Sequence, residues 1–353
     1  MLRRFQDLDW IGLFLWIFRA VIIVLIIWGT VATLIDNPYT REQWTDFIIF
    51  GVAQGSMYAL IAIGYTLVYG ILFMINFAHG EFFMSGIMTS TVLVAIPMAN
   101  TGFLNRQPIL SLLIIGLVAM IVSVGVALLT ERVAYRPWRK APRLVPVITA
   151  IGASFFWWNI YRGLIGSQVI PFTVPLQLKG TESLLGTEVL KTHIQVIITT
   201  SIMLVGLQLF IMRTRTGKSI RAVAEDKDSA ALMGIDVDRT VSITFATGAA
   251  MAGIAGLLYA LVFTQVNYFL GFVPGLKAFT AAVLGGIGSI PGAALGGLLI
   301  GLVESIGPSL FLQGLDVPAY HQLKDVIAFT MLVLVLIFRP QGILGERLAE
   351  KKA

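Results

Sequence analysis

Apolar stretches long enough to cross a lipid bilayer recur along the whole sequence. They occupy residues 11–34, 47–69, 82–98, 109–130, 144–164, 194–212, 241–263, 276–306 and 325–338. A helix needs about 20 apolar residues to span the hydrocarbon core, and lipid offers no partners for free backbone groups. None of the stretches alternates as the strands of a membrane barrel do. The sequence therefore predicts an all-α polytopic membrane protein with about eight to ten transmembrane segments, some of them broken or re-entrant.

The composition excludes most soluble alternatives. Charged residues make up 12% of the chain, mean hydropathy is +0.86 and cysteine is absent. No disordered chain, disulfide scaffold or soluble enzyme has this composition. The three histidines are too dispersed for local metal spacing, and no catalytic motif is present. We therefore expect neither enzymatic activity nor a metal or other cofactor.

Basic residues concentrate in a few polar segments. Seventeen of the 25 Lys and Arg residues lie in four segments, 3–4, 132–143, 213–239 and 339–352. Because cytoplasmic loops of membrane proteins carry an excess of Lys and Arg, all four segments are expected in the cytoplasm, together with both termini. The intervening loops are expected outside, at 36–46, 100–108 and 166–192. The net charge of +6 thus reflects orientation in a membrane and not a nucleic-acid partner.

The chain divides into three parts. Residues 1–45 are expected to form a retained signal-anchor helix and an outer loop, with Arg19 reaching toward the inner interface. Residues 46–345 are expected to form the transmembrane domain, and residues 346–353 a cytoplasmic tail.

Two apolar regions contain breaks. A single crossing by residues 276–306 would place Arg339 outside, so we expect this segment to enter and return in two arms of about 15 residues, turning at 285–292. A corresponding break is expected at Asn76 to Glu81. Paired interruptions of this kind point to a transport pathway, although an ordinary tight turn remains the alternative at the first of them.

Ionisable residues within apolar segments must face a cavity, a partner or the interface. His79 and Glu81 are the strongest pathway candidates, followed by Glu304. We expect Lys277, Lys324 and Asp325 to anchor helix ends at the interface. Purely structural pairing is the alternative for His79 and Glu81.

The largest basic segment carries a predicted helix over 218–233, ended by Gly234. Its mixed charges and small apolar face favour a docking surface for a cytoplasmic partner, with a solvated loop helix as the alternative. Small residues four apart favour close helix packing, at Ala249 and Gly253, Gly292 and Gly296, and Gly297 and Gly301.

Several long motifs closely resemble the branched-chain amino acid ABC permease family of the LivH type. They are QGSMYALIAIGYTLVYG at 54–70, MINFAHGE at 74–81, ERVAYRP at 131–137, AED at 224–226, LMGI at 232–235 and KAFTAAVLGGIGSIPGA at 277–293. The resemblance covers about residues 44–345, and the first 43 residues depart from it.

The resemblance implies one transmembrane subunit of an importer in the bacterial inner membrane. Its expected partners are a homologous second permease, two cytoplasmic ATP-binding subunits and a periplasmic substrate-binding protein, besides membrane lipid. The cargo would be a branched-chain or other neutral amino acid. The alternatives are a urea or amide importer and, in another class, a secondary transporter, whose usual mid-membrane carboxylate cluster is not evident in the sequence.

These roles fall on two sets of residues. For the solute pathway we expect hydrogen bonds from Asn76 and His79, attraction of an ammonium group by Glu81, and backbone groups at Gly286 and Gly288. The expected ATPase-coupling surface consists of Arg221, Glu225, Asp226, Met233 and Gly234, where a buried glycine or small residue would let the partner approach.

Overall fold

The structure, a computed structural model, describes residues 10–138, 141–142, 144–184, 187–339 and 341–345. The predicted tail 346–353 lies outside the described residues. So do eight of the basic residues used to orient the chain, namely Arg3, Arg4, Arg139, Lys140, Arg143, Arg347, Lys351 and Lys352.

Within the described residues, nine helical segments are long and apolar enough to cross a membrane. They are α1 (Trp10–Asp36), α2 (Arg41–Leu72), α3 with α4 (His79–Ser90 and Ile96–Asn100), α6 (Pro108–Thr130) with the turns that follow it to Trp138, α7 (Leu144–Ile165), α8 (Lys191–Arg213), α11 (Val237–Phe263), α13 (Ile290–Gly307) with the turns that follow it to Leu315, and α14 (Lys324–Phe338) with the preceding 3-10 turn (Tyr320–Leu323). The prediction of an all-α polytopic protein with eight to ten such segments is confirmed.

Short elements connect these helices. Four are helices, α5 (Phe103–Arg106), α9 (Arg215–Glu225), α10 (Lys227–Leu232) and α12 (Phe272–Gly285). Four are strands, β1 (Ile170–Pro171), β2 (Thr181–Leu184), β3 (Thr187–Leu190) and β4 (Gln265–Val266). The strands form two antiparallel pairs, β1 with β4 and β2 with β3.

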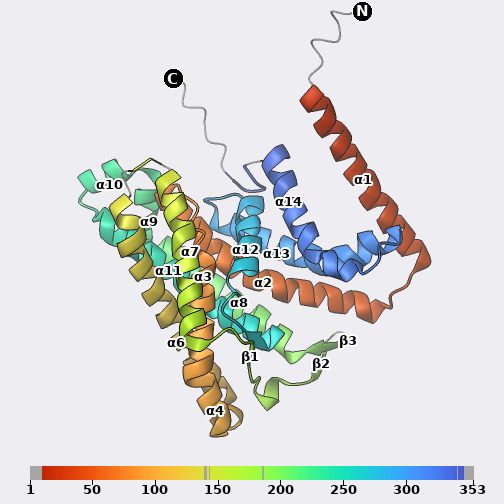
Figure 1. Ribbon diagram of the computed structural model, residues 1–353, viewed down its shortest axis with the longest axis horizontal. Coiled ribbons are helices and arrows are strands. Elements are labelled where there is room, and N and C mark those ends of the chain that lie inside the picture. The colour runs from red at the N-terminus through yellow and green to blue at the C-terminus, as the bar shows by residue number, and fades with distance from the viewer. Residues whose placement is uncertain (1–9, 139–140, 143, 185–186, 340, 346–353) are drawn as a thin grey trace, which may run out of the picture.

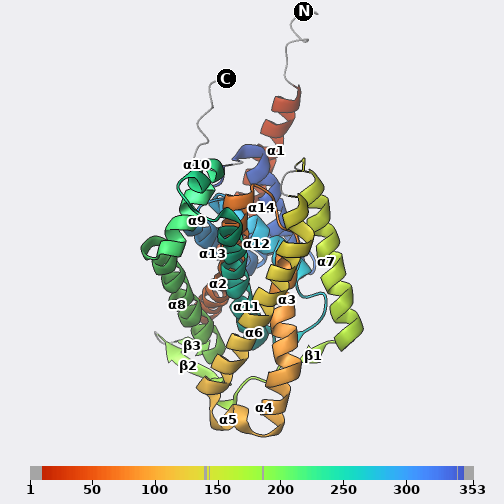
Figure 2. The ribbon, with the colours of Figure 1, turned by 90° about the vertical axis from the view of Figure 1, so that its left-hand side faces the viewer.

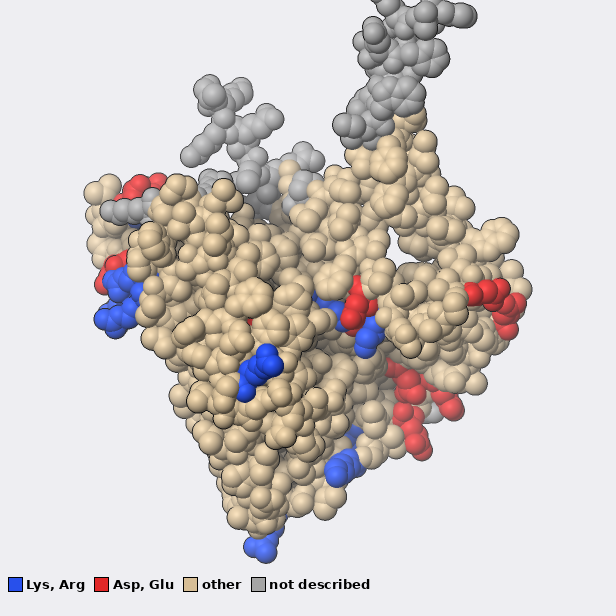
Figure 3. All heavy atoms as spheres, viewed as in Figure 1, with Lys and Arg blue, Asp and Glu red and all other residues tan. Residues whose placement is uncertain are grey.

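The connecting elements and the helix ends gather at two opposite ends of the molecule. The start of α1, the end of α14 and the α9–α10 pair lie at one end, whereas α4, α5 and the β2–β3 hairpin lie at the other (Figures 1 and 2). The basic residues of α9 therefore share an end with the helices that lead to both termini, as the charge pattern predicts. On the face shown in Figure 3, charged side chains occupy only a few places on an otherwise uncharged surface.

The core is built around α2, whose buried residues run from Gly51 to Ile71. Glycines let α13 contact α2 backbone to backbone: a Cβ placed on Gly301 would lie 2.2 Å from the amide nitrogen of Gly55, and one on Gly297 2.4 Å from that of Ala59. The predicted role of this glycine pair in packing is confirmed. The same holds for Gly253 against α6, for Gly292 and Gly296 against α12, and for Ala249, which is fully buried.

The interruption at 285–292 is present, with corrected arm lengths. Helix α12 ends at Gly285, and α13 begins at Ile290 after Ser289 caps its first turn by accepting from the amide of Gly292. The first arm has 14 residues, close to expectation. The second continues through a π-helical turn (Pro308–Leu312) and a 3-10 turn (Gln313–Leu315) to 26 residues and is long enough to span.

The first break begins earlier than predicted. Helix α2 ends at Leu72, where Phe73 takes a left-handed conformation with φ of 53°, and α3 already starts at His79. Residues 73–78 therefore form the interruption, and His79 and Glu81 belong to the first turn of α3.

Helix α1 lies beside α14 and projects away from the rest of the bundle (Figure 1). It contacts the rest of the chain mainly near its C-terminal end, where a Cβ on Gly29 would lie 2.0 Å from the carbonyl oxygen of Phe311. The Arg19 guanidinium lies 5.5 Å from the centre of the Phe338 ring at the end of α14. Most large apolar side chains of α1 are exposed, which suits a helix surrounded by lipid.

Candidate functional site

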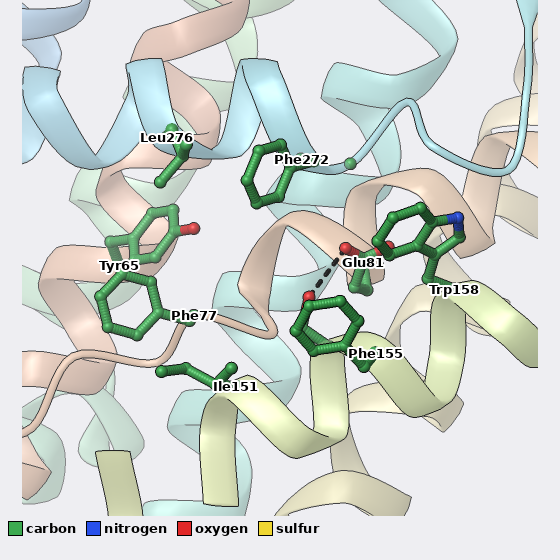
Figure 4. A pocket seen from close by; sticks show the side chains of 10 residues that line it. Tyr65, Phe77, Glu81, Ile151, Phe155, Trp158, Phe272 and Leu276 are labelled. Carbon is green, nitrogen blue, oxygen red and sulfur yellow. Dashed lines mark hydrogen bonds between the residues drawn. The ribbon is translucent and has the colours of Figure 1, made fainter. Parts of the chain in front are cut away.

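A cavity of about 230 Å³ lies between α7 and the core helices. Figure 4 shows its walls, which come from four parts of the chain: α2, the first break with the start of α3, α7, and the start of α12. The lining residues are Tyr65, Phe77, Glu81, Ile151, Ser154, Phe155, Trp158, Gly271, Phe272 and Leu276. The cavity is smaller than the roughly 300–1,000 Å³ of drug-sized ligand sites, so its size fits a small solute.

Among the described residues of this wall, Glu81 carries the only carboxylate, and no Lys, Arg or His lines it. Its side chain is almost fully buried, at 3% exposure. Oε1 accepts a hydrogen bond of 3.0 Å from the hydroxyl of Ser154, and Oε2 has no hydrogen-bond partner among the described residues. A buried carboxylate oxygen without a partner is costly, so this oxygen is available to a donor that enters the cavity.

Aromatic rings form most of the remaining wall. Trp158 packs on Phe269 with ring centres 4.5 Å apart, and Phe155 stacks on Trp158 at 5.6 Å. Phe77 comes from the first break and Phe272 from the first turn of α12 (Figure 4). Aromatic faces attract cations, and aromatic bodies accept apolar groups, so the wall suits a cation with an apolar remainder.

His79 does not line this cavity. Its ring is fully buried and packs on Tyr65 at 4.8 Å and on Phe82 at 5.5 Å. The slot that holds the ring requires a glycine on α2, since a Cβ on Gly64 would lie 2.1 Å from Nε2. Gly248 lets α11 approach α2 at this point, since a Cβ there would lie 3.1 Å from the Cα of Gly64. This placement favours the structural alternative for His79.

Asn76 also lies beside the cavity and not in its wall. Its Oδ1 accepts from the backbone amide of Ala78 at 3.1 Å and from the hydroxyl of Tyr135 at 2.5 Å. The side chain thus holds the turn into α3 and ties it to the π-helical turn (Glu131–Tyr135) that follows α6.

The two glycines of the second break have other surroundings. Gly286 has φ of 107°, and a Cβ there would lie 2.2 Å from the amide nitrogen of Gly345. The segment 342–345 covers the break, since the amides of Ile343 and Leu344 donate to the last carbonyls of α12. Gly288 is exposed with φ of 101°. Neither glycine lines the cavity, and the helix end that does so is the start of α12 at Gly271.

The predicted coupling helix is two helices. Asp226 ends α9 and caps α10, because its Oδ1 accepts from the amides of Asp228 and Ser229 at 2.9 and 3.1 Å. Arg221 and Glu225 are exposed on α9. The inner face of α9 is apolar and packs against the membrane helices through Ile220 and Val223.

The end of α10 presents apolar side chains to solvent. Leu232 and Met233 are 89% and 83% exposed, and the chain turns at Gly234 with φ of 82°. Gly234 is exposed, with no described atom within 4 Å of an added Cβ, so the space beside it is open to a partner. Its conformation, which disfavours other residues, is the reason for glycine there.

Two groups of residues escaped the sequence-based prediction. The α7 wall, with Ser154 and Trp158, lies in a stretch that reads as an ordinary spanning helix. Lys277 was expected at the interface, but it is buried at 4% exposure and forms ion pairs with Glu304 and Asp325. The prediction that Lys277 anchors a helix end at the interface is therefore wrong. Lys277 instead belongs to a buried cluster of charges within the bundle, which the sequence did not reveal.

Among the described residues, no group of three His, Cys, Asp or Glu side chains is placed to hold a metal ion. The chemistry that the cavity offers is hydrogen bonding, charge and apolar contact.

Comparison with known proteins places this geometry in a family context. The family model described as "Branched-chain amino acid transport system / permease component" matches residues 47–336, which include every residue of the cavity wall and begin after α1.

Individual relatives match over nearly their full length. The high-affinity branched-chain amino acid transport system permease protein BraD of Pseudomonas aeruginosa is 43% identical over 307 residues, covering 86% of this chain and 96% of the relative. The high-affinity branched-chain amino acid transport system permease protein LivH of Escherichia coli is 42% identical over 322 residues, covering 88% of this chain and 99% of the relative. The autoinducer 2 import system permease protein LsrC of Yersinia pestis is 28% identical over 336 residues, covering 90% and 83%.

Proposed function

This chain belongs to the family of branched-chain amino acid transport system permease components, and on that premise we propose that it is the transmembrane subunit of a bacterial importer for branched-chain or other neutral amino acids. It is a multi-pass membrane protein, and we place it in the inner membrane. Its proposed partners are a homologous permease, two cytoplasmic ATP-binding subunits that hydrolyse ATP, and a periplasmic substrate-binding protein. It carries half of the translocation pathway and has no catalytic role of its own.

The observation that carries the solute class is the unpartnered oxygen of Glu81 in an aromatic cavity. An amino acid brings an ammonium group, which the carboxylate and the aromatic faces attract, and an apolar side chain, which the rest of the wall accepts. The start of α12 at Gly271 adds the positive end of a helix dipole for the solute carboxylate. These contacts are few, as a pathway that must release its solute requires.

The proposed coupling surface is the exposed end of α10 with the charged face of α9. Leu232 and Met233 supply apolar area for a partner to bury, and the flanking Arg221 and Glu225 supply charges that set its orientation. An apolar pair so exposed at one end of a membrane protein is typical of an interaction site.

Glu81→Gln tests the pathway in vesicles that contain the whole complex. Leucine uptake is expected to fall at least tenfold while assembly and basal ATP hydrolysis stay unchanged, because the amide cannot compensate the ammonium charge. Glu188→Gln, the same change at an exposed position on β3, serves as the matched control. Unchanged leucine uptake in Glu81→Gln contradicts the assignment, and uptake of urea or acetamide in place of leucine by the unaltered complex contradicts the solute class.

A further inference from the structure

A cluster of charged side chains lies inside the bundle, outside the cavity described above. The Lys277 ammonium group, on α12, contacts the carboxylate of Glu304 on α13 and lies 2.6 Å from Oδ1 of Asp325 at the start of α14. The Lys277 and Glu304 side chains are 5% and 1% exposed. Charges so deeply buried are rare in membrane helices unless they are paired, and they mark places where function depends on them.

Hydrogen bonds extend the cluster to a fourth helix. The Tyr58 hydroxyl, on α2, donates to Oε2 of Glu304 at 3.0 Å and accepts from the amide of Gln54 at 2.7 Å. The Lys277 ammonium also lies 5.9 Å from the centre of the Tyr58 ring. The three consecutive helices α12, α13 and α14 and the distant helix α2 thus meet around one ammonium group.

Helix α12 needs such an attachment because it is short. Its 14 residues extend about 21 Å, less than the hydrocarbon core of about 30 Å, and it continues into non-helical residues at both ends. Its first turns nevertheless form one wall of the cavity through Phe272 and Leu276. Contacts from neighbouring helices must therefore fix the place of that wall.

Lys277 is on a different side of α12 from the cavity wall. At about 100° per residue it lies about 100° from Leu276 and about 140° from Phe272 around the helix axis. The ion pairs therefore draw α12 toward α13 and α14 without entering the cavity. Glu304 gives a buried anchor, whereas the Asp325 side chain, 44% exposed, links the same ammonium to the start of the peripheral helix α14.

We propose that Lys277 is a positioning residue for transport: its ion pairs with Glu304 and Asp325 fix α12 so that Phe272 and Leu276 stand at the correct place opposite Glu81. The transport part of this inference rests on the proposed function of the cavity. The positioning part is geometric and can be measured without transport.

The sequence contains no cysteine, so a cysteine pair reports the geometry directly. Phe155→Cys on α7 and Phe272→Cys on α12 place thiols on opposite walls at half-exposed positions. Crosslinking by a short bis-maleimide is measured in the assembled complex, with and without Lys277→Met combined with Glu304→Gln. The double change removes both buried charges together, so no uncompensated carboxylate of Glu304 remains.

The double variant is expected to assemble, to lose at least threefold in crosslinking yield and, without the added cysteines, at least tenfold in leucine uptake. Lys277→Arg, which keeps the charge, is expected to retain both within about twofold. The control is the ion pair between the half-buried Lys191 and the exposed Glu182, whose matched neutralisation by Lys191→Met with Glu182→Gln should change neither assembly nor uptake.

Unchanged crosslinking in the neutralised double variant overturns the positioning role, since the cluster would then only balance its own charges. If that variant does not assemble, Asp325→Asn replaces it with the same expected loss of crosslinking, and an unchanged yield there overturns the proposal equally. Reduced crosslinking with normal uptake supports the positioning of α12 and counts against the cavity as the solute site, so the two proposals can fail separately.

Discussion

Gly301→Ala, a change of one methyl group, tests how closely α13 and α2 must approach. The new Cβ would lie 2.2 Å from the amide nitrogen of Gly55 and 2.5 Å from the carbonyl oxygen of Gly51. Ordinary van der Waals contact begins near 3.4 Å, so the helices must separate by about 1.2 Å (3.4 minus 2.2) at this point. Both obstacles are backbone atoms of a helix, which cannot rotate away as a side chain can.

The cost follows from that separation. Overpacking a core by one methyl group costs about 1–3 kcal/mol, and the rigid backbone contact places this change at the upper limit, about 3 kcal/mol. The higher intrinsic helix propensity of alanine than of glycine stabilises the folded state by about 1 kcal/mol and offsets part of this cost. The net destabilisation is therefore about 2 kcal/mol. The change also acts on the charge cluster, because Glu304 lies one turn beyond position 301 and its 3.0 Å hydrogen bond from Tyr58 spans the same pair of helices.

The assay heats the purified complex in detergent and then measures its elution from a gel-filtration column. The measured quantity is the temperature at which half of the complex no longer elutes as a monodisperse peak. Gly301→Ala should lower it by roughly 3 °C, which is about 2 kcal/mol divided by an unfolding entropy of about 2.1 cal/mol/K for each of 353 residues, and should reduce leucine uptake. Gly125→Ala is the matched control, since this exposed glycine within α6 has no atom within 4 Å of an added Cβ and should leave stability unchanged or raise it. Equal temperatures for the two variants would refute the backbone contact between α2 and α13.

Two further predictions concern the ends of the molecule. Leu232→Ser with Met233→Ser should reduce co-purification of the ATP-binding subunits severalfold, because it removes the exposed apolar pair. Leu176→Ser, at an exposed position at the opposite end of the molecule, should leave co-purification unchanged. Equal co-purification of the two variants contradicts the docking site. A membrane-impermeant maleimide should label Gln177→Cys in intact cells and Lys218→Cys only after permeabilisation, and the reverse pattern would contradict the orientation inferred from the basic residues.

Features with a local cause could be predicted from the sequence. Each spanning helix is a run of apolar residues, so the number of helices followed directly from the pattern. Glycines at 285, 286 and 288 followed by Pro291 favour the end of one helix and the start of the next, and the second break was therefore predicted where it lies. Small residues four apart on a membrane helix favour close packing against another helix, and Gly297 and Gly301 pack against α2 in this way.

Features that depend on distant partners could not be predicted. An ionisable residue near the start of an apolar segment can reach the interface or find an opposite charge, and the partners of Lys277 lie 27 and 48 positions away. The location of His79 was equally hidden, because its slot requires a glycine on another helix. The α7 wall carries no local signal, since Ser154 becomes special only when α3 brings Glu81 beside it.

The same breaks that interrupt the helices account for a carboxylate in an apolar cavity. Glu81 lies in the first turn of α3, and its Oε2 would be 2.9 Å from a Cβ placed on Gly271, at the start of α12. Two helix N-termini, each equivalent to about half a positive charge, therefore meet at this carboxylate and offset part of its cost of burial. They can meet only because both contact positions are glycine, since a Cβ on Gly80 would lie 2.2 Å from the carbonyl oxygen of Gly271. An unbroken pair of spanning helices would carry its N-termini to the membrane surface, so the position of Glu81 within the bundle requires that α3 and α12 start inside it.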